Sequence, residues 1–379
     1  MSGKYRAFFD ILTGFFLGGS TVKIYYESIN TDEDSGSFIF RQNKKKIDEI
    51  CASHENLKVG KSERLISGQS GKKVDAVMNH EVFKFGQPHR FPEMLHYKNH
   101  VIAYDTARKI PLWVAEHLSK EKLTAVDMQA ERSKSSFQPD PNIPEKFQAK
   151  NEDYYKSGWT RGHMAPAGDN KFDQESMNET FFLSNILPQN FENNANFWYR
   201  MEVFCRNLTK QFSDVYVISG PLWLPCQQDG KKIVQYEVIG ENNVAVPTHL
   251  FKIILATNST TNAACMAAFE VPNQPITYKK SLTDFQIPLQ KLEKDSGFSF
   301  FEKTEKFKTK NLCEVAGCKL MSKDAMEVVM LRRQLGNAQN IEQLDQVWNK
   351  MDKEHSLDGS FSVLYEKRLK ELQQKTEPA

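Results

Sequence analysis

The stretch Trp159-Thr160-Arg161-Gly162-His163-Met164-Ala165-Pro166-Ala167-Gly168-Asp169-Asn170 decides how the rest of the 379-residue sequence is interpreted. It places a histidine, which exchanges protons near neutral pH, beside an arginine, whose planar cation fits phosphate oxygens. Glycine and proline let the backbone turn sharply and approach a ligand closely. We therefore expect a strand followed by a turn. These residue types suit phosphodiester hydrolysis, although a single histidine in a strand is more often structural.

The composition is that of a soluble globular protein with a sizeable core. Hydrophobic residues make up 40% of the chain and charged residues 26%, and the formal net charge is +2. This balance excludes a protein that coats nucleic acid through a global positive field. Any nucleic-acid binding must use a local groove.

The cysteines do not form a metal-binding pattern. There is no C-x-x-C pair and no histidine at zinc-ligand spacing, which favours free thiols in a reducing compartment. A disulfide between Cys313 and Cys318 stays open as an alternative. The six cysteines are Cys51, Cys205, Cys226, Cys265, Cys313 and Cys318.

The N-terminal region carries a weak targeting signal. Residues Phe8 to Val22 are mostly apolar or small and follow Lys4 and Arg6, but Asp10 interrupts the run. The run is short for a membrane span, and an acidic residue is atypical of a presequence. A signal-anchor, an organellar presequence and an N-terminal helix with an apolar face all remain open.

The pattern of elements predicts an α+β protein with a central antiparallel sheet and one long helix, because strands predominate without regular βαβ alternation. A helix is expected over 193–212, and a small C-terminal helical wing over 324–335, 341–351 and 362–374. We divide the chain into an N-terminal targeting segment and linker (1–76), a core domain (77–301) and the wing (302–379). Strands are expected at 82–86, 101–105, 112–118, 181–189, 214–221, 233–238, 250–255 and 265–271, the second and third forming a hairpin.

The long helix carries polar residues on one side. Asn194, Trp198 and Glu202 are spaced i, i+4, i+8. Asn194 and Glu202 would lie about 12 Å apart along the axis, too far to ligate one bare ion but compatible with a hydrated one. Structural alternatives are an N-cap for Asn194 and a solvated surface position for Glu202. The apolar set that should face the core is Phe197, Met201, Phe204, Cys205 and Leu208.

Three separated motifs occur in order: Arg161-Gly162-His163, then Ser184-Asn185-x-x-Pro188-Gln189, then Asn194-x-x-x-Trp198-x-x-x-Glu202. Over about residues 81–301 the sequence thereby resembles the DNA/RNA non-specific endonucleases of the ββα-metal (His-Me finger) superfamily. It is most similar to their mitochondrial endonuclease G-like branch. Thr160 stands where relatives have Asp and that branch usually has Ser, and residues 311–320 resemble the branch's C-terminal wing.

The resemblance implies a ββα-metal nuclease core with the following chemistry. His163 is the general base that takes a proton from the attacking water. Asn194 directly holds one Mg²⁺, for which Mn²⁺ is a substitute, and Glu202 hydrogen-bonds the metal-bound waters. A single protein ligand suits Mg²⁺, which dehydrates reluctantly.

Further residues receive roles from the same resemblance. Asn185 orients His163 or the water network, and Arg161 supports the phosphate or the strand geometry. Arg132, in a polar loop, is the nearest match to the arginine that stabilises the transition state. Lys134, in the same loop, is a second candidate contact to the substrate.

The implied function is metal-dependent hydrolysis of DNA, with RNA as an open alternative, by 5′–3′ exonuclease and endonuclease action. The branch implies a homodimer in mitochondria, at the inner membrane through the apolar run Phe8 to Val22. One rival is a sugar-non-specific endonuclease without end preference. The other is an inactive, membrane-tethered nucleic-acid-binding protein.

Overall fold

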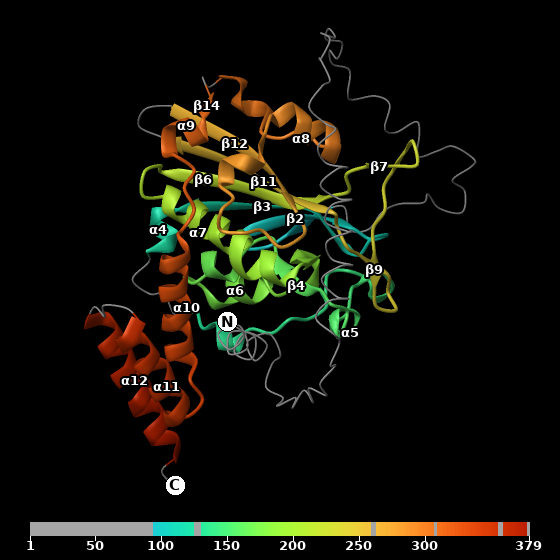
Figure 1. The fold of residues 1–379 in the computed structure, drawn as a ribbon. Helices are drawn as coiled ribbons and strands as arrows, with labels where there is room; N and C mark the ends of the chain where they lie inside the picture. Colours follow the sequence, from blue (N-terminus) through green and yellow to red (C-terminus); the bar gives the residue numbers. More distant parts are fainter. Residues whose placement is uncertain (1–93, 125–129, 259–262, 307–308, 355–358, 377–379) are drawn as a thin grey trace.

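The computed structural model describes residues 94–124, 130–258, 263–306, 309–354 and 359–376 (Figure 1). The apolar run at 8–22, the charged linker, Cys51 and the strand expected at 82–86 lie outside the described residues. Within the described ranges, every helix is too short or too polar to cross a bilayer.

An eight-stranded, mostly antiparallel sheet forms the centre of the molecule, as predicted. Its order is β1-β2-β3-β6-β11-β12-β13, and β14 pairs in parallel with β12. The expected hairpin is β2–β3, and the other main strands also match the predicted positions. The bounds are β1 Leu95–His96, β2 His100–Asp105, β3 Ile110–Ser119, β6 Asp214–Leu222, β11 His249–Asn258, β12 Ala263–Pro272, β13 Gln286–Ile287 and β14 Thr309–Asn311.

Smaller elements fill the connections between these strands. Three are two-stranded sheets: β4 Thr160–His163 with β5 Ile186–Gln189, β7 Cys226–Gln228 with β8 Lys231–Ile233, and β9 Val238–Ile239 with β10 Val244–Ala245. The short helices are α4 Lys120–Leu123, η3 Arg132–Lys134, η4 Glu145–Phe147, α5 Asn151–Tyr154, η5 Ala167–Asp169, α6 Gln174–Glu179, η6 Leu183–Asn185, η8 Leu282–Phe285 and η9 Glu302–Lys306.

Two strand predictions were partly wrong. Of the strand expected at 233–238, only Ile233, the end of β8, and Val238, the start of β9, lie in strands, and residues 234–237 between them do not. The strand expected at 181–189 is reduced to β5, because the preceding residues form the 3₁₀ turn η6.

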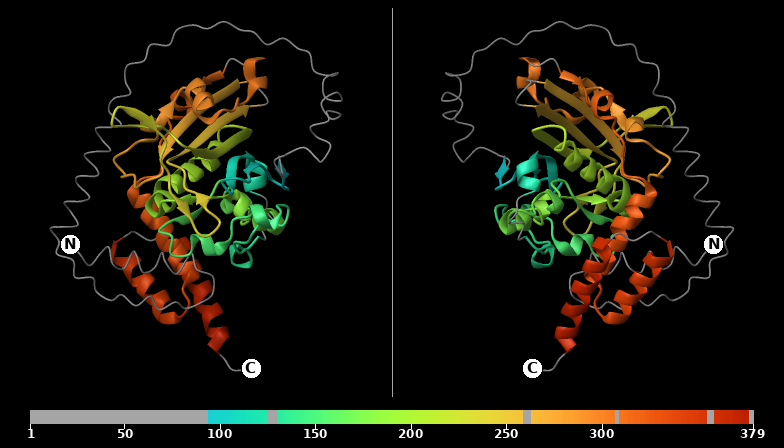
Figure 2. Two further views of the ribbon diagram at one scale, coloured as in Figure 1. Left: turned by 90° about the vertical axis from the view of Figure 1, so that its right-hand side faces the viewer. Right: turned by 90° about the vertical axis from the view of Figure 1, so that its left-hand side faces the viewer.

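Helices cover both faces of the sheet (Figures 1 and 2). On β11, Leu250 and Ile254 pack in the cluster that contains the helix α7 Tyr199–Leu208, whereas Phe251 and Ile253 pack with the helix α8 Leu289–Ser296. Alternate residues of a strand point to opposite faces, so this central strand is apolar on both sides. Among its buried residues 250–256 the polar one is Lys252, which lies on the α7 side.

The predicted long helix is confirmed, but its first part differs from an α-helix. Residues Asn193–Trp198 form a π-helical turn, η7, which continues into α7 and ends at Leu208. The predicted apolar set is buried throughout. The side chain of Asn193 donates to the carbonyl oxygens of Pro272 and Gln274 and accepts from Gln189, which fixes the first turn against the core. Single π turns occur often at functional sites.

The three predicted C-terminal helices are present as α10 Lys323–Asn337, α11 Ile341–Glu354 and α12 Gly359–Thr376. They pack around a small apolar core of their own, and Figures 1 and 2 show α11 and α12 extending away from the sheet. The segment 309–316, which precedes these helices, packs with the main core instead. Its strand β14 joins the central sheet, and Leu312, in the helix α9 Leu312–Ala316, is fully buried in the main core.

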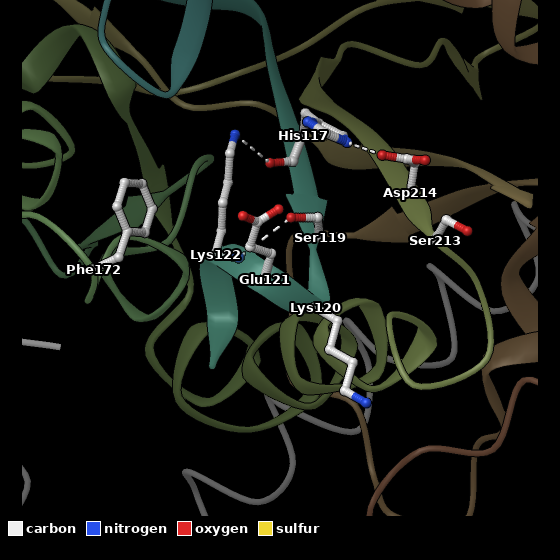
Figure 3. Close-up of a pocket in the computed structure, with 8 residues that line it drawn as sticks. All are labelled: His117, Ser119, Lys120, Glu121, Lys122, Phe172, Ser213 and Asp214. Carbon is white, nitrogen blue, oxygen red and sulfur yellow. Dashed lines mark hydrogen bonds and ion pairs between the residues drawn. The ribbon is translucent and has the colours of Figure 1, made fainter. Parts of the chain in front are cut away.

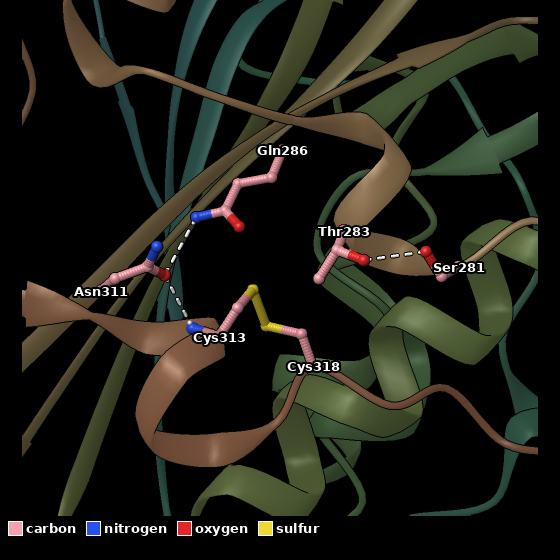
Figure 4. The surroundings of a disulfide bond; sticks show 6 residues. All are labelled: Ser281, Thr283, Gln286, Asn311, Cys313 and Cys318. Carbon is pink, nitrogen blue, oxygen red and sulfur yellow. Dashed lines mark hydrogen bonds between the residues drawn. A yellow bond between two sulfur atoms is a disulfide. The ribbon is translucent and has the colours of Figure 1, made fainter.

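The expectation of free thiols was wrong for Cys313 and Cys318, which form a disulfide across α9 (Figure 4). Gly317, with φ of 78°, ends this short helix in the left-handed conformation and brings the two cysteines to a Cα–Cα distance of 4.7 Å. Asn311 accepts from the backbone N–H of Cys313 and from Gln286. Cys205, Cys226 and Cys265 are free.

Replacing both bridged cysteines (Cys313→Ser with Cys318→Ser) should lower the free energy of unfolding. The bridge closes a loop with a sequence separation of 5, for which chain entropy predicts a loss on the order of 2 kcal/mol. Urea unfolding followed by circular dichroism measures this. Cys226→Ser, at a free cysteine, is the control and should be neutral; equal stabilities of the double variant and the wild type would contradict the prediction.

Candidate active site

The first and second sequence motifs form one small sheet. Thr160 pairs with Gln189 and His163 with Ile186 across β4 and β5. Gly162 lies against the side chain of Gln189, where a Cβ atom would come within 2.0 Å of Oε1. Glycine is therefore required between Arg161 and His163 for steric reasons, and the glutamine of the second motif is what requires it.

The third motif runs along β4, which explains its spacing. Asn194 Nδ2 donates to Thr160 Oγ1 (3.1 Å), at the start of the strand. Trp198 Nε1 donates to the backbone oxygen of His163 (3.3 Å), at its end. Glu202 follows on α7, within electrostatic range of Asp169 in the turn beyond the strand. The three motif residues thus follow the strand from its beginning into the next turn.

His163 lies in an aromatic enclosure formed by Phe137 and Phe181, whose ring centroids are 5.1 and 5.0 Å from its own. Its Nε2 atom is buried, and no described residue hydrogen-bonds to it. Burial, and then the cations Arg132 and Arg161, hold the pKa of the imidazole well below its usual value. At neutral pH the ring is therefore uncharged, so it can accept a proton.

The two arginines named from the sequence stack on the same aromatic rings. The guanidinium of Arg161 is 4.3 Å from the Phe137 centroid and donates to Asn151 Oδ1 (2.6 Å). The guanidinium of Arg132 is 5.0 Å from the Phe181 centroid and interacts electrostatically with both His163 and Glu202. Phe137 and Phe181 were not identified as site residues from the sequence, because nothing local distinguishes them from core aromatics.

The other two residues proposed from the sequence, Asn185 and Lys134, lie in opposite environments, one buried and one exposed. Asn185 is fully buried: Oδ1 accepts from the backbone N–H of Ala165 (2.9 Å), and Nδ2 donates to the carbonyl oxygens of Ala165 and Thr180 (2.9 and 2.8 Å). Two of these bonds fix the backbone at Ala165, just after His163, and the third ties it to Thr180. Lys134 makes an exposed ion pair with Glu131 (3.0 Å), with 60% of its side chain accessible.

Glu202, on α7, lies among several charged side chains. Burial is the largest cause that raises the pKa of its carboxyl, to about 7, and Asp169 raises it further, whereas Arg206, Lys252 and Arg333 lower it. Arg206 forms an ion pair with Asp169 (2.5 Å). Lys252 donates to Ser219 (2.6 Å), and its ammonium lies 4.5 Å from the Trp198 centroid. Lys252 was missed from the sequence, although a single cation in an apolar strand was a usable signal.

The C-terminal helices also contribute to the site. Arg333 on α10 stacks on Tyr199 of α7, with its guanidinium 4.3 Å from the ring centroid. Burial is the largest cause that lowers the pKa of Arg132 and of Lys171, and Arg333 lies close enough to lower both further by like-charge repulsion. Neither Arg333 nor Lys171 was identified from the sequence, because only tertiary packing brings them here.

Comparison with known proteins identifies the family. Residues 79–307 match the family described as DNA/RNA non-specific endonuclease. The chain belongs to this family. The family recognised in the sequence is thus confirmed, as is the assignment of the chain as a nuclease, a hydrolase.

Individual relatives of this non-specific endonuclease support the predicted branch. "Nuclease EXOG, mitochondrial" of Xenopus laevis is 48% identical over 297 residues, 77% of this chain and 82% of the relative. The protein of the same name from Homo sapiens is 46% identical, over 81% of this chain and 84% of the relative. "Mitochondrial nuclease" of Saccharomyces cerevisiae is 42% identical, over 64% and 75%.

A solved structure supports the predicted fold class. It is a chain of the "Crystal structure of the EndoG/EndoGI complex: Mechanism of EndoG inhibition", which superposes with a TM-score of 0.56 at 38% sequence identity. The match covers 61% of this chain and 94% of the solved chain. The mixed α+β core with its mostly antiparallel sheet is therefore that of a ββα-metal nuclease.

The site of this endonuclease fits a hydrated divalent ion better than a protein cage. The described residues contain no group of three or more His, Cys, Asp or Glu side chains that could hold a metal. Because Asn194 Nδ2 is bonded to Thr160, the amide oxygen is the side left for a metal. One amide oxygen as a direct ligand matches the preference of Mg²⁺ for oxygen ligands and retained water.

A separate surface hollow of about 610 Å³ lies on another part of the nuclease (Figure 3). It contains the ion pair of His117 with Asp214 (2.8 Å). None of the site residues proposed from the sequence lines it, so it is not the catalytic site. Its lining residues are His117, Ser119, Lys120, Glu121, Lys122, Phe172, Ser213 and Asp214.

Gly162→Ala should destabilise the nuclease. The new Cβ would also lie 2.8 Å from the Gln189 Cβ, so Gln189 must move and lose its bond to Asn193. Overpacking of this kind costs about 1–3 kcal/mol, measurable by urea unfolding. Gly359→Ala is the control, because no atom lies within 4 Å of the added Cβ. A variant as stable as the wild type would show that this contact is not tight.

Proposed function

We propose that this nuclease hydrolyses phosphodiester bonds in DNA, and also in RNA, with His163 as the general base. The observation that carries the proposal is the buried Nε2 atom without a described hydrogen-bond partner, on an imidazole whose pKa is lowered by burial and then by Arg132 and Arg161. A base must be unprotonated and free to approach the water that it activates. The neighbouring guanidinium groups also suit an anionic substrate.

Each remaining residue receives a role from its contacts. Asn194, through its amide oxygen, and Glu202, through water, would hold one Mg²⁺, or Mn²⁺ in its place. When bound, the ion supplies Lewis-acid stabilisation of the phosphate charge. Arg132 has electrostatic contact with both His163 and Glu202, which suits it to neutralise charge in the transition state. Arg161 supports the phosphate from the other side of the aromatic enclosure.

Two residues act at a distance from the reacting atoms. Asn185 holds the backbone next to His163 and thereby positions the base. Lys134 is proposed as an outer contact to the substrate, at the exposed edge of the loop that carries Arg132. Its contribution should be small and sensitive to salt.

His163→Ala tests the mechanism. The variant should cut supercoiled plasmid in the presence of Mg²⁺ about 100- to 10,000-fold more slowly, the usual contribution of a general base. His117→Ala is the matched control, because it removes a histidine that pairs with Asp214 in the separate hollow. Equal rates for wild type and His163→Ala, or no cleavage by either, would overturn the proposed mechanism.

We also propose 5′–3′ exonuclease action beside endonuclease action. The support is the position of α10, which adds the cation Arg333 near Arg132, Lys171 and Glu202. A helix beside the catalytic groups narrows the path of a continuing strand and favours an end. The rival is an endonuclease without end preference, which would cleave circular and linear DNA equally.

Arg333→Ala should reduce the ratio of cleavage rates on linear over circular DNA, because it removes the cation that α10 contributes to the site. Arg332→Ala is the matched control: the neighbouring arginine stacks on Phe361 within the C-terminal helices, 4.7 Å from the ring centroid. Equal wild-type rates on both substrates, or an unchanged ratio in Arg333→Ala, would exclude the proposed role of α10.

The cellular setting is proposed from the relatives, two of which are named mitochondrial EXOG nucleases. We place this nuclease in mitochondria as a homodimer, anchored at the inner membrane through the apolar run Phe8 to Val22. We also propose that the chain is organised into an N-terminal targeting segment and linker (1–76), a nuclease domain (77–301) and a C-terminal wing (302–379). Carbonate extraction of mitochondria tests the anchoring, and release into the soluble fraction would exclude it. Light scattering of the purified protein tests the dimer.

A further inference from the structure

Thr160 is the first residue of β4, and its hydroxyl takes part in two hydrogen bonds. Its hydroxyl donates to the backbone oxygen of Gln189 (2.8 Å). The single hydroxyl proton is thereby committed, and the oxygen can only accept a second bond. That second bond comes from Asn194 Nδ2 (3.1 Å).

This polarity determines which end of the Asn194 amide faces the strand. An amide turned by 180° would place Oδ1 against an oxygen that has no proton left to give, and the two lone pairs would repel. The amino group must therefore face Thr160, and the carbonyl oxygen must point the other way. A metal binds the oxygen of an amide and not its nitrogen.

Strand pairing and side-chain packing hold Thr160, Gln189 and the first turn of the helix together. Thr160 and Gln189 are paired residues of β4 and β5. The side chain of Gln189 lies against Gly162 and donates to Asn193, the residue before Asn194. The acceptor, the donor and the first turn of the helix are thus fixed to the same pair of strands.

We propose that Thr160 is a positioning residue that locks the Asn194 amide with its oxygen directed to the metal. The inference rests on the proposed role of Asn194 as the metal ligand. It also gives a physical reason for a neutral residue at this position. An aspartate would accept the same bond from Asn194, but it has no proton for Gln189. Thr160 keeps the accepting role without adding a charge.

The test is binding of Mn²⁺ alone to the full-length protein, followed by the electron paramagnetic resonance signal of the free ion. Thr160→Val keeps the shape of the side chain but removes the hydroxyl. Loss of one hydrogen bond should weaken Mn²⁺ binding about three- to tenfold. Thr160→Ser keeps the hydroxyl and should bind as the wild type does.

The variant Asn194→Ala distinguishes failure of the proposed metal ligand from failure of the proposed role of Thr160. If Asn194→Ala binds Mn²⁺ as tightly as the wild type, the proposed metal ligand is wrong. If Asn194→Ala loses binding while Thr160→Val binds like the wild type, the metal site stands and the lock is wrong. Thermal unfolding in EDTA checks that the variants fold, and Thr160→Ala replaces Thr160→Val if the valine variant does not. Equal binding by that alanine variant and the wild type would also overturn the proposal.

Discussion

The close approach of Gln189 to Gly162 is the constraint on which the rest of the site depends. A side chain lies where any other residue would have its Cβ atom, so β4 and β5 can come together only with glycine at this position. From there Gln189 reaches Asn193 and fixes the π turn that presents Asn194. The three motifs are therefore one mechanical unit, although 41 positions separate Arg161 from Glu202 (202 − 161).

The two ionisable groups proposed for the chemistry are shifted in opposite directions. Burial lowers the pKa of the base His163 and raises that of the acid Glu202 to about 7. Desolvation acts against the charged form in both cases, but the neighbours differ: only cations act on His163, whereas Asp169 opposes the cations around Glu202. One buried region thus holds two ionisable groups whose pKa values are shifted in opposite directions, because burial disfavours the charged form of each.

How much the sequence could predict depended on whether a feature is local or tertiary. The motifs and the apolar periodicity predicted the family, the sheet and the long helix, because strand pairing and helix faces follow from the pattern of nearby residues. The π turn was not predictable, since it results from bonds of Asn193 to Pro272 and Gln274. Arg333 was missed because only the packing of α10 on α7 brings it to the site, and the Cys313–Cys318 bridge was left open because it depends on the left-handed turn at Gly317.

The net charge of +2 conceals a local excess of positive charge. Arg132 and Arg161 lie around His163. Arg333 lies near Arg132 and Glu202, and Lys171 lies near Arg333. The pKa values of Arg132, Arg161 and Lys171 are all lowered, with burial as the largest cause. Removing neighbouring cations from water costs free energy when no anion is bound to the protein. A polyanion placed among them would relieve that cost, so the groups are already in position when a phosphate arrives. A local cluster of cations of this kind suits a nucleic acid without a strongly basic surface elsewhere, as the near-neutral composition of the chain requires.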